Sequence, residues 1–162
     1  MKNPIIYALF AFVLALPCQS IAQVPVSANP NHEQMLASGD AKLAANKRLV
    51  YDFWREVFEG GHLELSEKYL ADSYIQHNPN VPTGRAGFVE FFGKFSKPRP
   101  IQPRIKAPLV TIMAEADMVV LVFVSEQANP NDAGKKYATT WFDMFRIENG
   151  KIAEHWDPDQ IR

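Results

Sequence analysis

The chain is poor in the residues that form disulfides and structural metal sites. It has a single cysteine, Cys18, and we find no cysteine and histidine spacing typical of a zinc site. A disulfide within one chain is therefore excluded, and stability must come from packing. Lys and Arg total 17 against 18 Asp and Glu, without a basic run. Nucleic acid and anionic membrane surfaces are accordingly poor candidates as partners.

Long hydrophobic runs are also missing, apart from one near the N-terminus. Residues 5–16 are apolar, follow a single Lys2 and precede a small-residue cleavage site at Ala22. The run is well short of the ~20 residues that cross a bilayer, so the pattern predicts a secretory signal peptide over residues 1–22. We expect the protein to be exported, periplasmic or secreted, and free of the membrane after cleavage. Lipidation of Cys18 is not expected, because a proline precedes it.

The remainder of the chain has the size of a single domain. Residues 23–39 contain two prolines and few apolar residues, which predicts a flexible leader, and residues 40–162 form the domain. Helical periodicity and glycine or proline stops predict helices over residues 40–59, 63–70 and 85–95. Extended patterns then predict strands over residues 105–114, 118–127, 137–147 and 152–157. Helices followed by antiparallel strands indicate an α+β domain, with helices on one face of a curved sheet.

The predicted strand over residues 118–127 contains an apolar stretch without polar alternation. Residues 119–124 read VVLVFV, so both faces of this strand must be covered. The helices can cover one face only. We therefore expect a homodimer formed through the sheet, with residues 119–124 and His155 as candidate contacts; the alternative is that long loops enclose the strand.

The last two strands form a hairpin that places a carboxylate among aromatic rings. Asn149 and Gly150 are typical of a two-residue turn with positive φ angles. Counting outward from this turn pairs Ile147 with Ile152, Phe145 with Glu154 and Asp143 with Trp156. Asp143 then shares a face with Trp141, Phe145 and Trp156. Burial among such rings would raise the pKa of Asp143, as a general acid or base requires.

Asp143 also has an ordinary interpretation. It could be a solvated residue on an edge strand, or a carboxylate neutralised by a structural partner such as Arg146 or Arg104. The pattern of residues alone leaves these alternatives open.

Three segments carry a resemblance to a known family. They are KYLADSYIQHNP at residues 68–79, GRAGFVEFF at residues 84–92 and FDMFRIENGKIAEHWD at residues 142–157. With these segments in this order, the chain resembles a SnoaL-like, polyketide cyclase-like protein of the nuclear-transport-factor-two-like (NTF2-like) superfamily over about residues 43–158.

The resemblance implies a cone-shaped roll, with about three N-terminal helices packed on a curved, mainly antiparallel sheet. It implies a pocket inside the cone and no metal or organic cofactor. In the cyclases that the chain resembles, the catalytic acid or base is an aspartate at the position of Asp143. The candidate substrate-binding residues are Tyr74, Gln76, Phe91, Trp141, Phe145 and Trp156.

Two histidines are further candidates. By resemblance His77 lies near the mouth of the cone, where an imidazole could hydrogen-bond a substrate carbonyl or exchange a proton; alternatively it fixes the turn at Asn78. His155 belongs on the face opposite Asp143 unless a bulge intervenes, which favours an interface or structural role. Relatives often carry histidines within the second strand of the sheet, whereas this chain has Val122, Phe123 and Val124 there.

The first functional hypothesis is a cofactor-independent enzyme that acts on a small hydrophobic carbonyl compound. Asp143 would remove a proton α to the carbonyl, and the enolate would isomerise, eliminate or add in an aldol-type step. His77, Tyr74 or Gln76 would donate a hydrogen bond to the enolate oxygen. The alternative is a binding protein for a small hydrophobic ligand, which the missing second-strand histidines favour.

Overall fold

The computed structural model describes residues 24–161. The predicted signal peptide over residues 1–22, and Cys18 with it, lies outside the described residues. Within the described part, no helix is long and apolar enough to cross a membrane.

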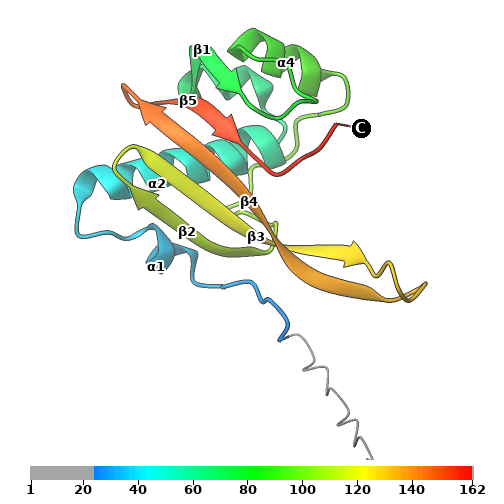
Figure 1. Cartoon of the computed structure of the whole chain (residues 1–162). Helices are drawn as coiled ribbons and strands as arrows, with labels where there is room; N and C mark the ends of the chain where they lie inside the picture. The colour runs from blue at the N-terminus through cyan, green and yellow to red at the C-terminus, as the bar shows by residue number, and fades with distance from the viewer. Residues whose placement is uncertain (1–23, 162) are drawn as a thin grey trace, which may run out of the picture.

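A five-stranded mixed sheet forms one layer of the fold, with the strand order β1-β5-β4-β3-β2 (Figure 1). Its strands are β1 (Leu70–Gln76), β2 (Leu109–Glu115), β3 (Met118–Ala128), β4 (Lys136–Glu148) and β5 (Lys151–Trp156). β1 pairs with β5 in parallel, and the other neighbours are antiparallel. The predicted α+β class and mainly antiparallel sheet are confirmed.

The helices precede β2 in the chain. They are α1 (His32–Leu36), α2 (Ala41–Phe53), the π-helical segment η1 (Trp54–Glu59), the 3₁₀ turn η2 (Leu63–Leu65), α3 (Ser66–Tyr69) and α4 (Arg85–Gly93). Asp40 caps α2 by accepting hydrogen bonds from the backbone N–H groups of Lys42 and Leu43. α2 and η1 are continuous, so the predicted helix over residues 40–59 is present, with its last part wound as a π-helix.

The segment expected to be a flexible leader contains α1. Leu36 is 4% exposed and belongs to the core cluster. The Lys47 ammonium of α2 donates hydrogen bonds to the carbonyls of Met35 and Ala37, at 2.7 and 2.6 Å, and so satisfies carbonyls at the end of α1. These contacts hold residues 32–36 against the domain, which sequence composition did not predict.

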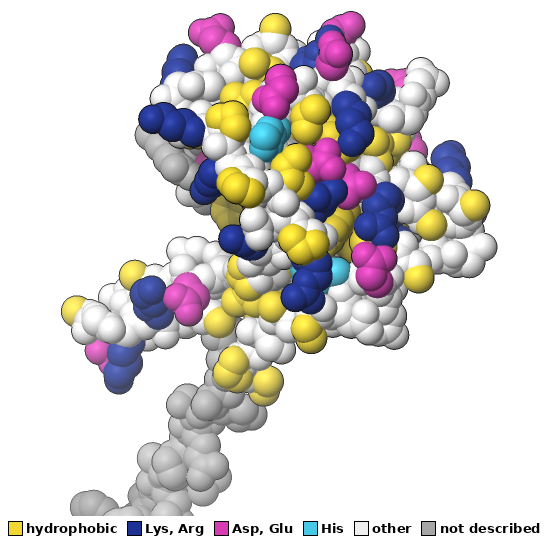
Figure 2. Space-filling model, turned by 180° about the vertical axis from the view of Figure 1, so that it is seen from behind, with side chains coloured by type: hydrophobic (Ala, Val, Ile, Leu, Met, Phe, Trp, Pro, Cys, Tyr) yellow, Lys and Arg dark blue, Asp and Glu magenta, His cyan; other side chains and the backbone are white. Residues whose placement is uncertain are grey.

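The core lies between the helices and one face of the sheet. Val50, Phe53 and Val57 pack from the helical side, and Leu121 and Phe145 from the sheet. The far ends of β3 and β4 extend past the rest of the sheet as an arm (Figures 1 and 2). Figure 2 also shows acidic and basic side chains interspersed over this face of the molecule.

The β4–β5 hairpin follows the predicted register for two pairs and then departs from it. Asn149 and Gly150 have φ angles of 50° and 71°, and Ile147 pairs with Ile152 as predicted. A β-bulge follows, because Ala153 is an additional residue in β5.

Beyond the bulge, the predicted pairs are wrong by one residue. Arg146 pairs with Glu154, and Phe145 pairs with His155. Because side chains alternate between the faces of a strand, this slip brings His155 onto the inner face. It moves Glu154 and Trp156 to the outer face.

Candidate active site

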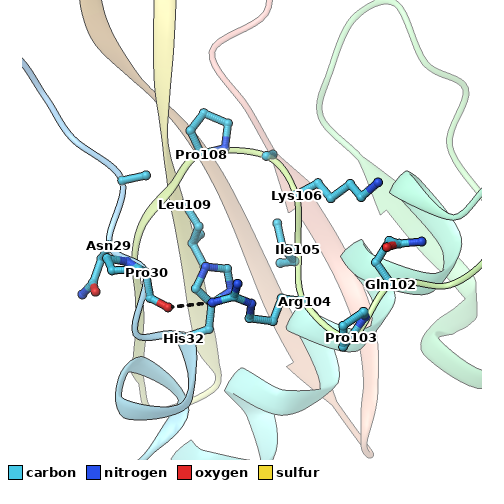
Figure 3. Close-up of a pocket in the computed structure, with 12 residues that line it drawn as sticks. Asn29, Pro30, His32, Gln102, Pro103, Arg104, Ile105, Lys106, Pro108 and Leu109 are labelled. Carbon is cyan, nitrogen blue, oxygen red and sulfur yellow. Dashed lines mark hydrogen bonds between the residues drawn. The ribbon is translucent and has the colours of Figure 1, made fainter.

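Two hollows lie on either side of the segment that leads into β2. The smaller, of about 500 Å³, lies between residues 28–32 and residues 102–109 (Figure 3). Arg104 crosses it and donates a hydrogen bond to the carbonyl of Pro30 at 3.1 Å. None of the predicted site residues lines this hollow. The larger, of about 720 Å³, lies inside the cone and shares Ala107 and Pro108 with the smaller one as a common wall.

The cavity inside the cone collects six of the eight predicted site residues. These are Asp143, Tyr74, Gln76, Phe91, Trp141 and Phe145. An aromatic stripe along α4 and just beyond it consists of Phe88, Phe91, Phe92 and Phe95, and all four line the cavity. Phe88 is also 3% exposed and belongs to the core. The stripe therefore serves both as core and as cavity lining.

The other two predicted residues, His77 and Trp156, lie outside the cavity. Their rings stack on each other with centroids 4.6 Å apart and an interplanar angle of 6°. His77 Nε2 lies 3.0 Å from Oε2 of Glu154, and Nε of Arg146 donates a hydrogen bond to the other carboxylate oxygen, Oε1, at 2.7 Å. This cluster occupies the outer face because of the bulge. The placement of His77 and Trp156 in the pocket is therefore corrected.

His155 takes the place beside Asp143 that was expected for Trp156. Its Nε2 lies 3.0 Å from Oδ1 of Asp143. Both residues are buried, with 8% and 3% of their surface exposed. The second carboxyl oxygen of Asp143, Oδ2, is also buried and has no hydrogen-bond partner among the described residues. The site thus holds an imidazole and a carboxyl group in direct contact, with one oxygen of the carboxyl group uncommitted.

Burial raises the pKa of Asp143, because a charged carboxylate loses the solvation that water provides. The hydrogen bond with His155 opposes this shift, and the nearby carboxylate of Asp157 adds to it. The Trp141 indole also lowers the pKa, although it does not reach hydrogen-bonding geometry with Oδ2. The net direction is upward. A carboxyl group of this kind can exchange protons nearer neutral pH than an exposed aspartate can.

Residues from β1 support the other side of the imidazole. Nδ1 of His155 lies 2.9 Å from Oε1 of Gln76, and Nε2 of Gln76 donates to the hydroxyl of Tyr74 at 3.1 Å. Burial, and secondarily the Asp157 and Asp143 carboxylates, raise the pKa of Tyr74 strongly. Its hydroxyl therefore stays protonated and can donate a hydrogen bond.

Asp143, His155 and Asp157 lie close enough together to be candidate ligands of one metal ion. One ligand atom from each lies within 4.8 Å of the other two. Both nitrogens of His155 are engaged, however, Nε2 with Asp143 and Nδ1 with Gln76. The Asp157 carboxylate accepts two hydrogen bonds from the side-chain amide of Asn78, at 3.0 and 2.8 Å. A cation would have to displace such bonds, so the arrangement suits proton exchange better than metal binding.

Comparisons with known proteins show which family the chain matches. The family model described as SnoaL-like polyketide cyclase matches residues 48–160. A candidate polyketide cyclase from Acidithiobacillus ferrooxidans is 22% identical, with a TM-score of 0.51 over 75% of this chain and 89% of that one. A candidate SnoaL-like polyketide cyclase from Jannaschia sp. CCS1 is 14% identical, with a TM-score of 0.52 over 75% of this chain and 91% of that one. At these identities the two structures support the fold alone. Comparison with curated proteins gave no match.

Proposed function

Because the chain belongs to the SnoaL-like polyketide cyclase family, we propose that it is a cofactor-independent acid/base enzyme acting on a small hydrophobic carbonyl compound. The observation that carries this proposal is the contact between Asp143 and His155 in the wall of an aromatic cavity. A buried carboxyl group with a raised pKa and an imidazole partner is suited to accept and return a proton.

The proposed step begins at Oδ2 of Asp143, which has no hydrogen-bond partner among the described residues. The ionised carboxylate takes a proton from the carbon α to the substrate carbonyl, and the electron pair of the broken C–H bond forms the enolate. The protonated hydroxyl of Tyr74 lines the same cavity and is a candidate donor to the enolate oxygen. The enolate then isomerises, eliminates or adds to a second carbonyl, and Asp143 returns the proton.

The cavity wall also supports a class of substrate. Among the described residues that line it, Asp143, Asp157 and Asp159 are acidic, and none is Lys or Arg. Most of the remaining lining is aromatic or aliphatic. A substrate carboxylate or phosphate would meet like charges there, and the imidazole of His155 is already engaged by Asp143 and Gln76. Burying such a group is costly in a poorly solvated site. We therefore expect the substrate to be hydrophobic and to carry no anionic group.

The second candidate function is a binding protein without catalytic activity. One observation favours it: Phe123 of β3 stacks on Trp54 with centroids 4.6 Å apart, in a strand where relatives often carry histidines. A wall of stacked rings would hold an apolar ligand without chemistry. The pair formed by Asp143 and His155 favours the enzyme, because binding an apolar ligand does not require a buried carboxyl group.

Deuterium exchange distinguishes the two functions. Neutral aromatic ketones and esters are incubated with the protein in D₂O, and exchange at the α carbon is followed by mass spectrometry. Asp143→Asn should lower the exchange rate at least ~100-fold while ligand binding persists. Asp72→Asn is the matched control, because the Asp72 side chain is 88% exposed. Binding without exchange by the unmodified protein, or full exchange by Asp143→Asn, would contradict the enzyme.

We also propose that the protein is exported and processed near Gln23, as the N-terminal sequence pattern supports. Mass spectrometry of the exported protein should find an N-terminus close to this residue and no lipid. A mature protein that begins at a diacylated Cys18 would overturn this proposal.

The outer face of the sheet supports a proposed homodimer. Phe142 and Met113 are 47% and 51% exposed there, and the half-buried Val120 of β3 lies on the same face. A second copy of the chain would bury this apolar surface. Light scattering at micromolar concentration should give twice the mass of one chain, and Phe142→Glu should lower it. A monomer before substitution would contradict the dimer.

A further inference from the structure

Gln76 lies beside His155 in the paired strands β1 and β5, and it is held from three directions. Its Oε1 accepts a hydrogen bond from the backbone N–H of Asn78 at 3.0 Å and lies 2.9 Å from Nδ1 of His155. Its Nε2 donates to the Tyr74 hydroxyl at 3.1 Å. The backbone N–H of His77 donates to the carbonyl of His155, which holds the two strands together at this point.

The backbone N–H of Asn78 determines which way the Gln76 amide faces. A backbone N–H can only donate, so the side-chain atom that it meets must be the carbonyl oxygen rather than the NH₂ group. That oxygen carries no hydrogen. The ring nitrogen of His155 that meets the same oxygen must therefore be the donor, which places a proton on Nδ1.

This protonation of Nδ1 has a consequence for the other ring nitrogen. With Nδ1 protonated, Nε2 either accepts a proton from the Asp143 carboxyl group or, in the imidazolium form, donates one to the carboxylate. In both cases one proton lies between Nε2 and Oδ1 of Asp143. The other neutral tautomer of His155 carries its proton on Nε2 and none on Nδ1. It is disfavoured, because two hydrogen-bond acceptors, Nδ1 and the Gln76 oxygen, would then face each other without a proton between them.

We propose that Gln76 is a positioning residue that keeps Nδ1 of His155 protonated, so that His155 and Asp143 share a single exchangeable proton. This inference rests on the proposed function of the same site and adds which side of the His155 ring exchanges the proton. Proton exchange takes place on the side of the ring that faces Asp143. Gln76 meets Nδ1 at 2.9 Å on the other side, where the Asp157 carboxylate also lies 3.9 Å from Nδ1. Gln76 thus acts through His155 rather than on the substrate.

The tautomer can be measured without any substrate. Long-range ¹H–¹⁵N spectra of protein labelled with ¹⁵N-histidine report which imidazole nitrogen carries the proton. The unmodified protein should show His155 with Nδ1 protonated at every pH at which it is folded. A neutral His155 protonated at Nε2 would overturn the proposal.

Two substitutions separate positioning from packing. Gln76→Met keeps the length of the side chain and removes the acceptor, so part of the neutral His155 population should shift to protonation at Nε2. Gln76→Glu restores an acceptor and should restore protonation at Nδ1. Gln127→Met is the control, because Gln127 lies on the exposed part of β3 and its side-chain amide donates to Ser125 of the same strand. An unchanged tautomer in folded Gln76→Met would contradict the proposal.

Kinetics add a second readout once a substrate is found. Gln76→Met should lower turnover by about 10-fold or more and displace the pH–rate profile, whereas a purely structural role would leave the profile in place. Gln76→Glu keeps an acceptor beside Nδ1 and should retain more turnover than Gln76→Met. If no carbonyl compound is turned over, the proposed enzyme fails while the tautomer measurement still decides the role of Gln76.

Discussion

The molecule buries two histidines to the same extent, in different chemical surroundings. His155 and His32 are each 8% exposed. Nδ1 of His32 lies 2.6 Å from the hydroxyl of Tyr51. The same hydroxyl accepts a hydrogen bond from the backbone N–H of Ile105 at 3.1 Å. Nε2 of His155 instead meets the carboxyl group of Asp143. The first imidazole joins α1 to the domain through a hydroxyl group, and the second is paired with a group that can exchange a proton.

The difference shows that burial alone does not make a reactive histidine. Burial, with the Arg104 guanidinium as a second cause, lowers the pKa of His32, and burial raises the pKa of Tyr51. Both groups are therefore kept neutral. Beside His155, burial raises the pKa of Asp143, which moves its proton exchange toward neutral pH. We infer that the partner of the imidazole decides its role.

The largest expected effect is on turnover. His155→Gln should lower catalysis by roughly 100-fold or more, because glutamine can form a hydrogen bond but cannot exchange a proton at neutral pH. His32→Gln should leave turnover within about 2-fold, since the charge state of His32 has no part in the reaction. Steady-state kinetics with a substrate from the exchange screen measure both. Equal losses would remove the distinction between the two histidines.

The next effect is on stability around His32. Tyr51→Phe leaves the backbone N–H of Ile105 and Nδ1 of His32 without a partner, and it should cost about 1–3 kcal/mol of unfolding free energy. Tyr137→Phe is the control, because Tyr137 is 41% exposed. Urea unfolding of both variants gives the difference. A cost for Tyr51→Phe no greater than that of the control would mean that the His32 cluster does not hold the N-terminal segment.

A third effect concerns the pH dependence of stability at Asp143. The folded protein holds the proton of Asp143 more tightly than the unfolded chain does, for which the reference pKa is 3.8. Stability is therefore lost as pH rises through the interval from that value to the raised folded-state pKa. Asp143→Asn removes this loss, and its amide can donate to Nε2 of His155. Its unfolding free energy should exceed that of the unmodified protein at neutral pH, with a smaller gain near pH 3.8.

The smallest expected effect runs in the opposite direction, at His32. Its folded-state pKa is lowered from the reference of 6.5, so the unfolded chain takes up a proton that the folded protein resists. Stability is lost as pH falls from that reference through the lowered value. His32→Gln should flatten the acid side of the curve of unfolding free energy against pH. If His32→Gln left the acid side of this curve unchanged, the loss of stability at low pH would come from other groups.

Much of the cone could be predicted from the sequence, because local patterns determine most of it. The positive φ angles at Asn149 and Gly150 and the pairing of Ile147 with Ile152 followed from the turn residues alone. The long helix followed from its periodicity and from the glycines, Gly60 and Gly61, that end it. α1 was missed, because five residues carry little periodicity and its anchor, Lys47, comes from another helix.

The site was predicted only as far as the bulge. Because Ala153 is an additional residue, every side chain after it in β5 points to the opposite face from the one predicted. A small apolar residue such as alanine gives no sequence signal of a bulge. A signal was nevertheless present. The strict register would have placed Glu154 on the buried face with Asp143, whereas the slip pairs it with Arg146 at 2.7 Å. The cost of burying two carboxylates together could have favoured the bulge, and with it the placement of His155.

The most direct test is the titration of Asp143 itself, followed by the ¹³C chemical shift of its side-chain carboxyl group. We predict a midpoint above the reference value of 3.8, because burial penalises the charged carboxylate more than its hydrogen-bond partners stabilise it. In His155→Gln the midpoint should rise further, since the charge interaction with His155, which opposes the effect of burial, is lost. A midpoint at or below 3.8 in the unmodified protein would contradict this, and would make Asp143 a structural counterion of His155.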